Sequence, residues 1–250
     1  MLTDKISDWI AQQVKAANAA GLVIGVSGGI DSAVTSVLAA KTGLPLLAVT
    51  MPIKQHSDHQ RRADEQLEFL CKTFKNVQAE CISLSSTFLC LSAVLGESLV
   101  FEGNKELALV NTRSRLRMTC LYALANARNA LVIGTGNKVE DFGIGFFTKY
   151  GDGGVDISPI GDLTKTQVRE LAKELGVPES IQKAAPSDGL WGDARSDEEQ
   201  IGATYEELEK AMSGAAPENA REEEVLKIYN QRHQQTRHKM TMPPVCIIGE

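Results

Sequence analysis

The residues with the most chemical information run from Ser27 to Ser32, Ser-Gly-Gly-Ile-Asp-Ser, and follow an apolar run at 22–26. The apolar run predicts a buried strand, and the composition after the motif predicts a helix. A glycine turn between a strand and a helix exposes backbone N–H groups at the positive end of the helix dipole. Gly28 and Gly29 would let a phosphate approach the backbone. Asp31 fits beside phosphate only if a cation such as Mg²⁺ lies between them.

This motif differs from two common phosphate loops. It lacks the Gly-x-x-x-x-Gly-Lys-Ser/Thr pattern of kinases and GTPases and the Gly-x-Gly-x-x-Gly fingerprint of dinucleotide-binding domains. It resembles the loop of the ATP pyrophosphatases, which split ATP into AMP and pyrophosphate. A bare Gly-Gly turn would indicate an ordinary strand–helix connection, but the two serines and the aspartate favour a phosphate site.

Alternating strands and helices are expected to position this loop. Apolar runs predict strands at 21–26, 45–51, 77–82 and 131–134, and helices near 30–42, 57–75 and 105–128. Such alternation is typical of a doubly wound parallel sheet flanked by helices. The resemblance of the motif to the ATP pyrophosphatase loop implies a fold similar to the adenine-nucleotide alpha-hydrolases. Helix-opening capping boxes are predicted at Ser57, Thr164 and Ser196. No linker or repeat divides the sequence, so one domain over residues 1–250 is expected.

Composition narrows the class of protein. The 250 residues are 43% hydrophobic, enough for a full core, and the net charge of −6 argues against a nucleic-acid-binding surface. Charged residues within 1–20 indicate an amphipathic helix instead of a signal peptide, and no apolar stretch is long enough to span a membrane. The five cysteines lack Cys-x-x-Cys spacing. They fit free thiols in a reducing cytoplasm and disfavour a zinc site.

A second loop, Gly134-Thr-Gly-Asn137, follows the strand expected at 131–134 and leads into a polar, glycine-rich segment. Ligands of open α/β sheets bind at this edge, where the strands end. Here the resemblance becomes specific, because the chain resembles the NAD synthetases from about residue 20 to 210 and again at 238–239. The motifs that carry it are Ser27–Ser32, Arg115–Met118, Gly134–Asn137, Phe147–Gly154, Pro186–Trp191 and Thr204-Tyr205.

The resemblance implies a ligase of NAD biosynthesis that amidates deamido-NAD to NAD⁺. ATP would convert the pyridine carboxylate to an adenylate with release of pyrophosphate, and ammonia would then displace AMP. The carboxylate needs this activation because its own leaving group would be oxide. The synthetase match begins near the N-terminus and leaves no room for an amidase domain, so free ammonia is the expected nitrogen source.

The resemblance also implies a role for each matching residue. ATP would be bound by Ser27, Gly28, Gly29, Ile30, Asp31, Ser32, Thr135, Lys165 and Ser187. A magnesium ion (Mg²⁺) would be bound by Asp31 and Glu140. Deamido-NAD would be bound by Arg115, Lys149, Asp156, His238 and Lys239. Asp152 would receive ammonium and take its proton, and Lys165 would also take part in catalysis.

A homodimer is expected, because NAD synthetases are homodimers with the dinucleotide site near the subunit boundary. The stretch 106–128 agrees, since it carries apolar residues on more than one face and so needs a partner besides the sheet. His238 and Lys239 could serve either subunit.

Two other functions stay open. A tRNA-thiolating or lysidine-forming ATP pyrophosphatase would need a basic surface and, for thiolation, usually catalytic cysteines. A non-enzymatic adenine-nucleotide sensor would use the first loop but not the carboxylates and lysine of 134–163. Taken singly, Arg115 and His238 would be solvated side chains and Gly153-Gly154 a hairpin turn, so only their combination favours a site.

Overall fold

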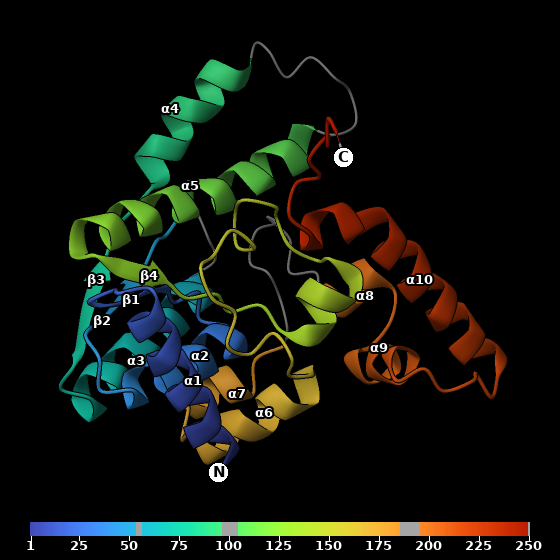
Figure 1. The fold of residues 1–250 in the computed structure, drawn as a ribbon, viewed down its shortest axis with the longest axis horizontal. Helices are drawn as coiled ribbons and strands as arrows, with labels where there is room; N and C mark the ends of the chain where they lie inside the picture. The colour runs from blue at the N-terminus through green and yellow to red at the C-terminus, as the bar shows by residue number, and fades with distance from the viewer. Residues whose placement is uncertain (54–56, 97–104, 186–195, 250) are drawn as a thin grey trace.

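Four parallel strands form the centre of the fold in the computed structural model, which describes residues 1–53, 57–96, 105–185 and 196–249 (Figure 1). The strands lie in the order β3-β2-β1-β4 and are β1 (Gly21–Gly25), β2 (Leu46–Thr50), β3 (Val77–Cys81) and β4 (Ala130–Val132). All three pairings are parallel. The four predicted strands are therefore confirmed, although β4 is shorter than predicted and Ile133 forms only an isolated bridge with Ile157.

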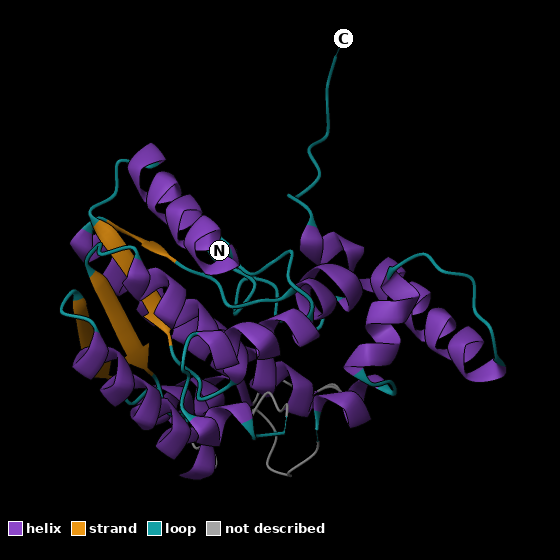
Figure 2. Cartoon of the chain, turned by 90° about the horizontal axis from the view of Figure 1, so that it is seen from below, coloured by secondary structure: helices purple, strands orange, loops and turns teal. Residues whose placement is uncertain are grey.

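Helices surround this sheet and continue beyond it toward the C-terminus (Figures 1 and 2). They are α1 (Leu2–Ala16), α2 (Ile30–Lys41), α3 (Ser57–Thr73), α4 (Ser85–Gly96), α5 (Lys105–Arg128), the π-helix η1 (Lys138–Ile144), α6 (Lys165–Glu174), α7 (Glu179–Gln182), α8 (Asp197–Ile201), α9 (Tyr205–Met212) and α10 (Ala220–Met240). The helices predicted near 30–42, 57–75 and 105–128 are confirmed as α2, α3 and α5. No helix in the described ranges is long and apolar enough to cross a membrane.

Alternate strand residues pack on opposite faces of the sheet. Val23, Leu47 and Val132 face the buried stripe of α5, which includes Met118 and Leu121. On the other face, side chains of α1, α2, α3 and α6 pack against Leu22, Ile24, Leu46 and Ala48. The burial of both faces explains why the strands read as continuous apolar runs, and the doubly wound architecture is confirmed.

The carboxyl ends of β1 and β4 mark the place where the chain changes direction across the sheet. β1 lies between β2 and β4. From β1 the chain first builds the sheet on one side, with β2 and β3, and later adds β4 on the other side of β1. A crevice at such a switch point is the usual ligand site of an open α/β sheet. Both predicted loops, 27–32 and 134–137, follow these two strands.

Reciprocal capping boxes fix the start of several helices. Those predicted at Thr164 and Ser196 are confirmed and open α6 and α8. A further box, not predicted, opens α9 through Thr204 and Glu207. At Ser57 the prediction stays open, since α3 begins at this residue directly after a range outside the described part.

Gly28 offers a test of how tightly α3 supports the first loop. Its φ is +85°, and an added Cβ would overlap the His59 carbonyl oxygen of α3. Gly43 has a similar φ of +73° but open space around it. Both alanine variants should lose about 1–2 kcal/mol of unfolding free energy, because alanine is strained in the left-handed region. Gly28→Ala should lose roughly a further 1–3 kcal/mol of unfolding free energy from the overlap. Urea denaturation of the two variants measures this difference, and equal stabilities would contradict the close packing.

Candidate active site

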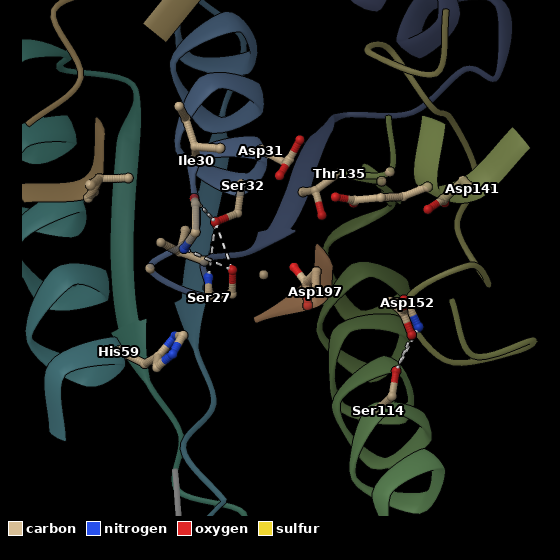
Figure 3. A pocket seen from close by; sticks show the side chains of 18 of the residues that line it. Ser27, Ile30, Asp31, Ser32, His59, Ser114, Thr135, Asp141, Asp152 and Asp197 are labelled. Atoms are coloured by element: carbon tan, nitrogen blue, oxygen red, sulfur yellow. Dashed lines mark hydrogen bonds between the residues drawn. The ribbon is translucent and has the colours of Figure 1, made fainter. Parts of the chain in front are cut away.

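One cavity gathers most of the residues predicted to bind ATP and metal. It lies beyond the carboxyl ends of β1 and β4, between the first loop, α5 and the segment after β4 (Figure 3). The predicted residues that line it are Ser27, Gly28, Gly29, Ile30, Asp31, Ser32, Thr135, Glu140, Asp152 and Lys165. Side chains from sequence positions more than a hundred residues apart thus converge where the sequence predicted a ligand.

The first loop is held in shape by its own serines. Ser32 Oγ accepts a hydrogen bond from the Ser27 backbone N–H at 3.2 Å and donates one to the Gly29 carbonyl at 2.9 Å. Ser27 Oγ accepts from the Gly29 N–H at 3.2 Å. Gly29 is the N-cap of α2 and supplies no side-chain cap, so N–H groups at the start of α2 are left for a ligand. The serines therefore preorganise the loop as well as offering hydroxyls.

A buried ionic network lies next to this loop. Lys165, only 3% exposed, places Nζ at 2.6 Å from Asp31 Oδ2 and 2.8 Å from Glu140 Oε1. Asn137 donates to the other oxygen of Asp31 at 2.9 Å, and the Tyr205 hydroxyl donates to Glu140 at 2.5 Å. Burial alone would lower the pKa of Lys165, but the two carboxylates outweigh it and raise that pKa above its ordinary value. The ammonium is therefore charged throughout the physiological pH range.

The donor set of Asp31 and Glu140 suits a magnesium ion. Both carboxylates contact the same ammonium, so one cation can lie within reach of both. Hard oxygen ligands are those that Mg²⁺ prefers, and it commonly takes one or two carboxylates together with water and phosphate oxygens. Within the described ranges no group of three or more metal-ligating side chains was found. The network thus fits a metal shared with a phosphate ligand better than an all-protein cage.

Asp152 is fixed to the cavity wall by Ser114, a residue of α5 that sequence reasoning missed (Figure 3). Ser114 Oγ donates to Asp152 Oδ1 at 2.5 Å and accepts from the Asp152 backbone N–H at 2.8 Å. The Thr148 N–H donates to the same carboxylate oxygen at 3.1 Å. These contacts hold Asp152 in one orientation, as a group that must accept a proton at a defined place requires.

Asp141 is a second residue that the sequence reading missed. It lines the cavity near Asp152 (Figure 3), and its carboxylate lies directly over Gly136. Burial, together with the charges of Asp152, Glu140 and Asp31, raises the pKa of Asp141 well above its ordinary value. A signal was present in the sequence, because Asp141 directly follows the predicted ligand Glu140.

Most residues predicted to bind deamido-NAD lie together, but they do not line the cavity that holds the first loop. Arg115 Nε donates to the Lys149 carbonyl at 3.2 Å, and Lys149 Nζ donates to the His238 carbonyl at 2.5 Å. Lys239 Nζ donates to the carbonyls of Gly145 and Phe147, each at 2.8 Å. The structure therefore joins the C-terminal pair to the segment after β4 in a basic group.

Two predicted site residues stand apart from this group. Both carboxylate oxygens of Asp156 accept hydrogen bonds, one from the Val132 N–H of β4 at 2.7 Å and the other from the Tyr122 hydroxyl of α5 at 2.9 Å. Its binding role stays a prediction. Ser187 and the rest of its motif, Pro186–Trp191, lie outside the described residues.

Comparisons with known proteins agree with this geometry. The model of the NAD synthase family matches residues 2–243. The chain is 43% identical over 246 residues to the NH(3)-dependent NAD(+) synthetase of Syntrophomonas wolfei, covering 97% of this chain and 94% of that protein. The solved NMN synthetase from Francisella tularensis superposes with a TM-score of 0.88 and 36% identity, over 98% of this chain and 97% of that chain. The NH3-dependent NAD synthetase from Campylobacter jejuni superposes with a TM-score of 0.74 and 28% identity, over 98% of each chain.

The ionic network predicts a large stability difference between two lysines of α6. Lys165→Met would leave two buried carboxylates without their shared cation and should cost about 3–5 kcal/mol of unfolding free energy. Lys173→Met, at an exposed position of the same helix, should change it by less than about 0.5 kcal/mol. Urea denaturation without ATP or metal measures both. Similar stabilities for the two variants would show that Lys165 does not neutralise the carboxylates.

Proposed function

The chain belongs to the NAD synthase family, and from this premise we propose how its residues divide the work of the reaction. The enzyme uses ATP and ammonia to convert deamido-NAD to NAD⁺. The pyridine carboxylate attacks the α-phosphorus of ATP, pyrophosphate leaves, and ammonia then displaces AMP from the adenylate. The observation that carries the assignment is that the first loop and the Asp31–Lys165–Glu140 network line one cavity.

The phosphates of ATP are assigned to the first loop. Its backbone N–H groups, with the hydroxyls of Ser27, Ser32, Thr135 and Ser187, would bind the phosphate oxygens, and Lys165 would lie on the phosphate side of ATP while it neutralises Asp31 and Glu140. Asp31 and Glu140 would hold Mg²⁺, which lowers the repulsion between the triphosphate and an incoming carboxylate. The remaining work of the chain is to place two anions in contact and to exclude water.

The second half of the reaction is assigned to Asp152 and the basic group. Asp152, oriented by Ser114, would bind ammonium and accept its proton, so that neutral ammonia attacks the adenylate. Arg115, Lys149, Asp156, His238 and Lys239 would bind deamido-NAD. The support for this is the cluster formed by Arg115, Lys149 and the carboxyl end of α10 beside the loop that carries Asp152.

A second candidate differs in substrate and not in chemistry. Of the two solved structures compared, the NMN synthetase superposes with the higher TM-score. An enzyme that forms NMN by the same amidation would start from nicotinate mononucleotide, which carries the same pyridine carboxylate without the adenylate half. The cavity at the end of β1 would activate the pyridine carboxylate of either substrate. Only the binding of the adenylate half, which nicotinate mononucleotide lacks, would distinguish deamido-NAD from it.

A homodimer built on α4 and α5 is also part of the proposal. The sequence of α4 is mostly apolar, yet Phe88 is the only buried residue in it, and Leu89 and Val94 are 48% and 74% exposed. Leu107 of α5 is also 46% exposed. Helix α4 starts against α5 and angles away from it (Figure 1), so a second copy could cover the apolar surface that the two helices leave exposed.

Two broader expectations belong to the same proposal. The match over residues 2–243 supports one synthetase domain over 1–250. All five cysteines are free thiols, which supports a cytoplasmic protein.

The direct test of the function is an amidation assay. With ATP, Mg²⁺ and ammonium, deamido-NAD should yield NAD⁺ with equal amounts of AMP and pyrophosphate, and glutamine alone should not replace ammonium. A parallel assay with nicotinate mononucleotide, compared by kcat/KM, decides between the two substrates. Turnover with neither would contradict both candidates.

Asp31 should be essential for pyrophosphate release. Asp31→Ala removes a proposed Mg²⁺ ligand and should lower kcat at least about 10²-fold, since a metal contributes several kcal/mol of charge stabilisation. Asp162→Ala is the control, because Asp162 is 95% exposed and, among the described residues, pairs with Lys138 alone. Thermal unfolding of both variants separates lost activity from lost structure. Near-normal turnover in a folded Asp31→Ala variant would show that the reaction does not need Asp31 as a metal ligand.

The α4–α5 surface should control assembly. Sedimentation should show a species of twice the 27.0 kDa chain mass. Val94→Glu should shift it toward monomer, because the change buries a charge in the proposed interface. Val245→Glu, at a tail residue that is 77% exposed, is the control and should leave the mass unchanged. A monomeric wild-type enzyme with full activity would contradict the dimer.

A further inference from the structure

Arg62 is a cation of the cavity that none of the roles above uses. It lies on α3, the helix that packs against the back of the first loop, and it lines the same cavity as Asp31 and Lys165. Its guanidinium Nε donates to the Gly28 carbonyl at 3.2 Å. Arg62 is therefore fixed to the backbone of the loop that we assign to phosphate.

The rest of the Arg62 guanidinium has no partner among the described residues. Within the described part of the chain, its bond to Gly28 is the one hydrogen bond of this side chain and it forms no ion pair, although the charge of Asp58 acts on it from nearby. The neighbouring acid, Asp58, is bridged to Arg61 at 3.6 Å. Burial lowers the pKa of Arg62, because the charge is partly removed from water without a carboxylate in contact. A guanidinium has five N–H donors, so most of its hydrogen-bonding capacity is unused.

Two other cations at this cavity are neutralised by carboxylates, whereas Arg117 of α5 donates Nε to the Met51 carbonyl at 3.0 Å. Lys165 is shared by two carboxylates, and Arg169 pairs with Glu206 at 2.7 Å. The cavity lining also contains several acids, namely Asp31, Glu140, Asp141, Asp152 and Asp197. A polyphosphate that enters such a cavity needs a positive charge that is not already paired, and Arg62 supplies one next to the loop.

We propose that Arg62 binds the triphosphate of ATP, and the pyrophosphate formed from it, from the α3 side of the first loop. This inference rests on the proposed function only in taking the first loop as the phosphate site. Figure 3 shows His59, from the same helix, and Asp152 on opposite sides of Ser27. Arg62 would thus hold the leaving group on the side of the loop away from the amidation chemistry. The planar guanidinium can form two parallel bonds to phosphate, and its bond to Gly28 reduces the entropy lost on binding.

Calorimetric titration of the full-length protein tests this without any turnover. ATP, pyrophosphate and AMP, each with Mg²⁺, are titrated into wild type, Arg62→Gln and Arg61→Gln in the absence of deamido-NAD and ammonium. Arg62→Gln should bind ATP and pyrophosphate at least about tenfold more weakly, the scale expected for a lost charge-assisted contact. Its affinity for AMP should change less than about twofold, and Arg61→Gln, at a side chain that is 64% exposed, should match wild type.

Two results would overturn the proposal. Unchanged ATP and pyrophosphate affinity in Arg62→Gln would show that the guanidinium does not meet these phosphates. An equal loss for AMP and ATP would show that Arg62 only supports the loop through Gly28. If Arg62→Gln does not fold, Arg62→Met, which also removes the charge, is measured against the same criteria. Because nucleotide binding is measured without amidation, a failure of this inference is distinguishable from a failure of the proposed reaction.

Discussion

The contact on which the rest of the site depends is the buried bridge from Lys165 to Asp31 and Glu140. It joins the first turn of α2, the π-helix η1 and the first residue of α6. Two buried carboxylates would repel each other without the lysine, and a buried lysine would lose its charge without them. Tyr205 extends the same network to α9, so the C-terminal helices are tied to the sheet edge through the atoms proposed to bind the metal.

This arrangement separates two kinds of charge around one cavity. The first loop offers backbone N–H groups and, through Arg62, an unpaired cation, which suits the departing pyrophosphate. The opposite wall offers Asp152, which suits ammonium and its proton. Pyrophosphate released from ATP would leave toward one wall, and ammonia, which then displaces AMP from the adenylate, would arrive from the other.

Much of the fold could be predicted because its signals are local. The strands are short apolar runs, and the boxes at Thr164 and Ser196 follow from residues three positions apart. Ser114 and Arg62 could not be found in this way, because their partners are 38 and 34 residues distant and only the fold brings them together. Helix α4 was also missed. Its apolar residues show no clear face, which is reasonable for a helix whose partner is proposed to be a second copy of the chain.

The central claim is that the carboxyl edge of the sheet activates a carboxylate by attack on the α-phosphorus of ATP. Deamido-NAD labelled with ¹⁸O in its pyridine carboxylate tests this most directly, with AMP and pyrophosphate analysed by mass spectrometry after amidation. Attack on the α-phosphorus transfers one labelled oxygen to AMP and leaves pyrophosphate unlabelled. Unlabelled AMP, with ¹⁸O in pyrophosphate or phosphate instead, would contradict the account.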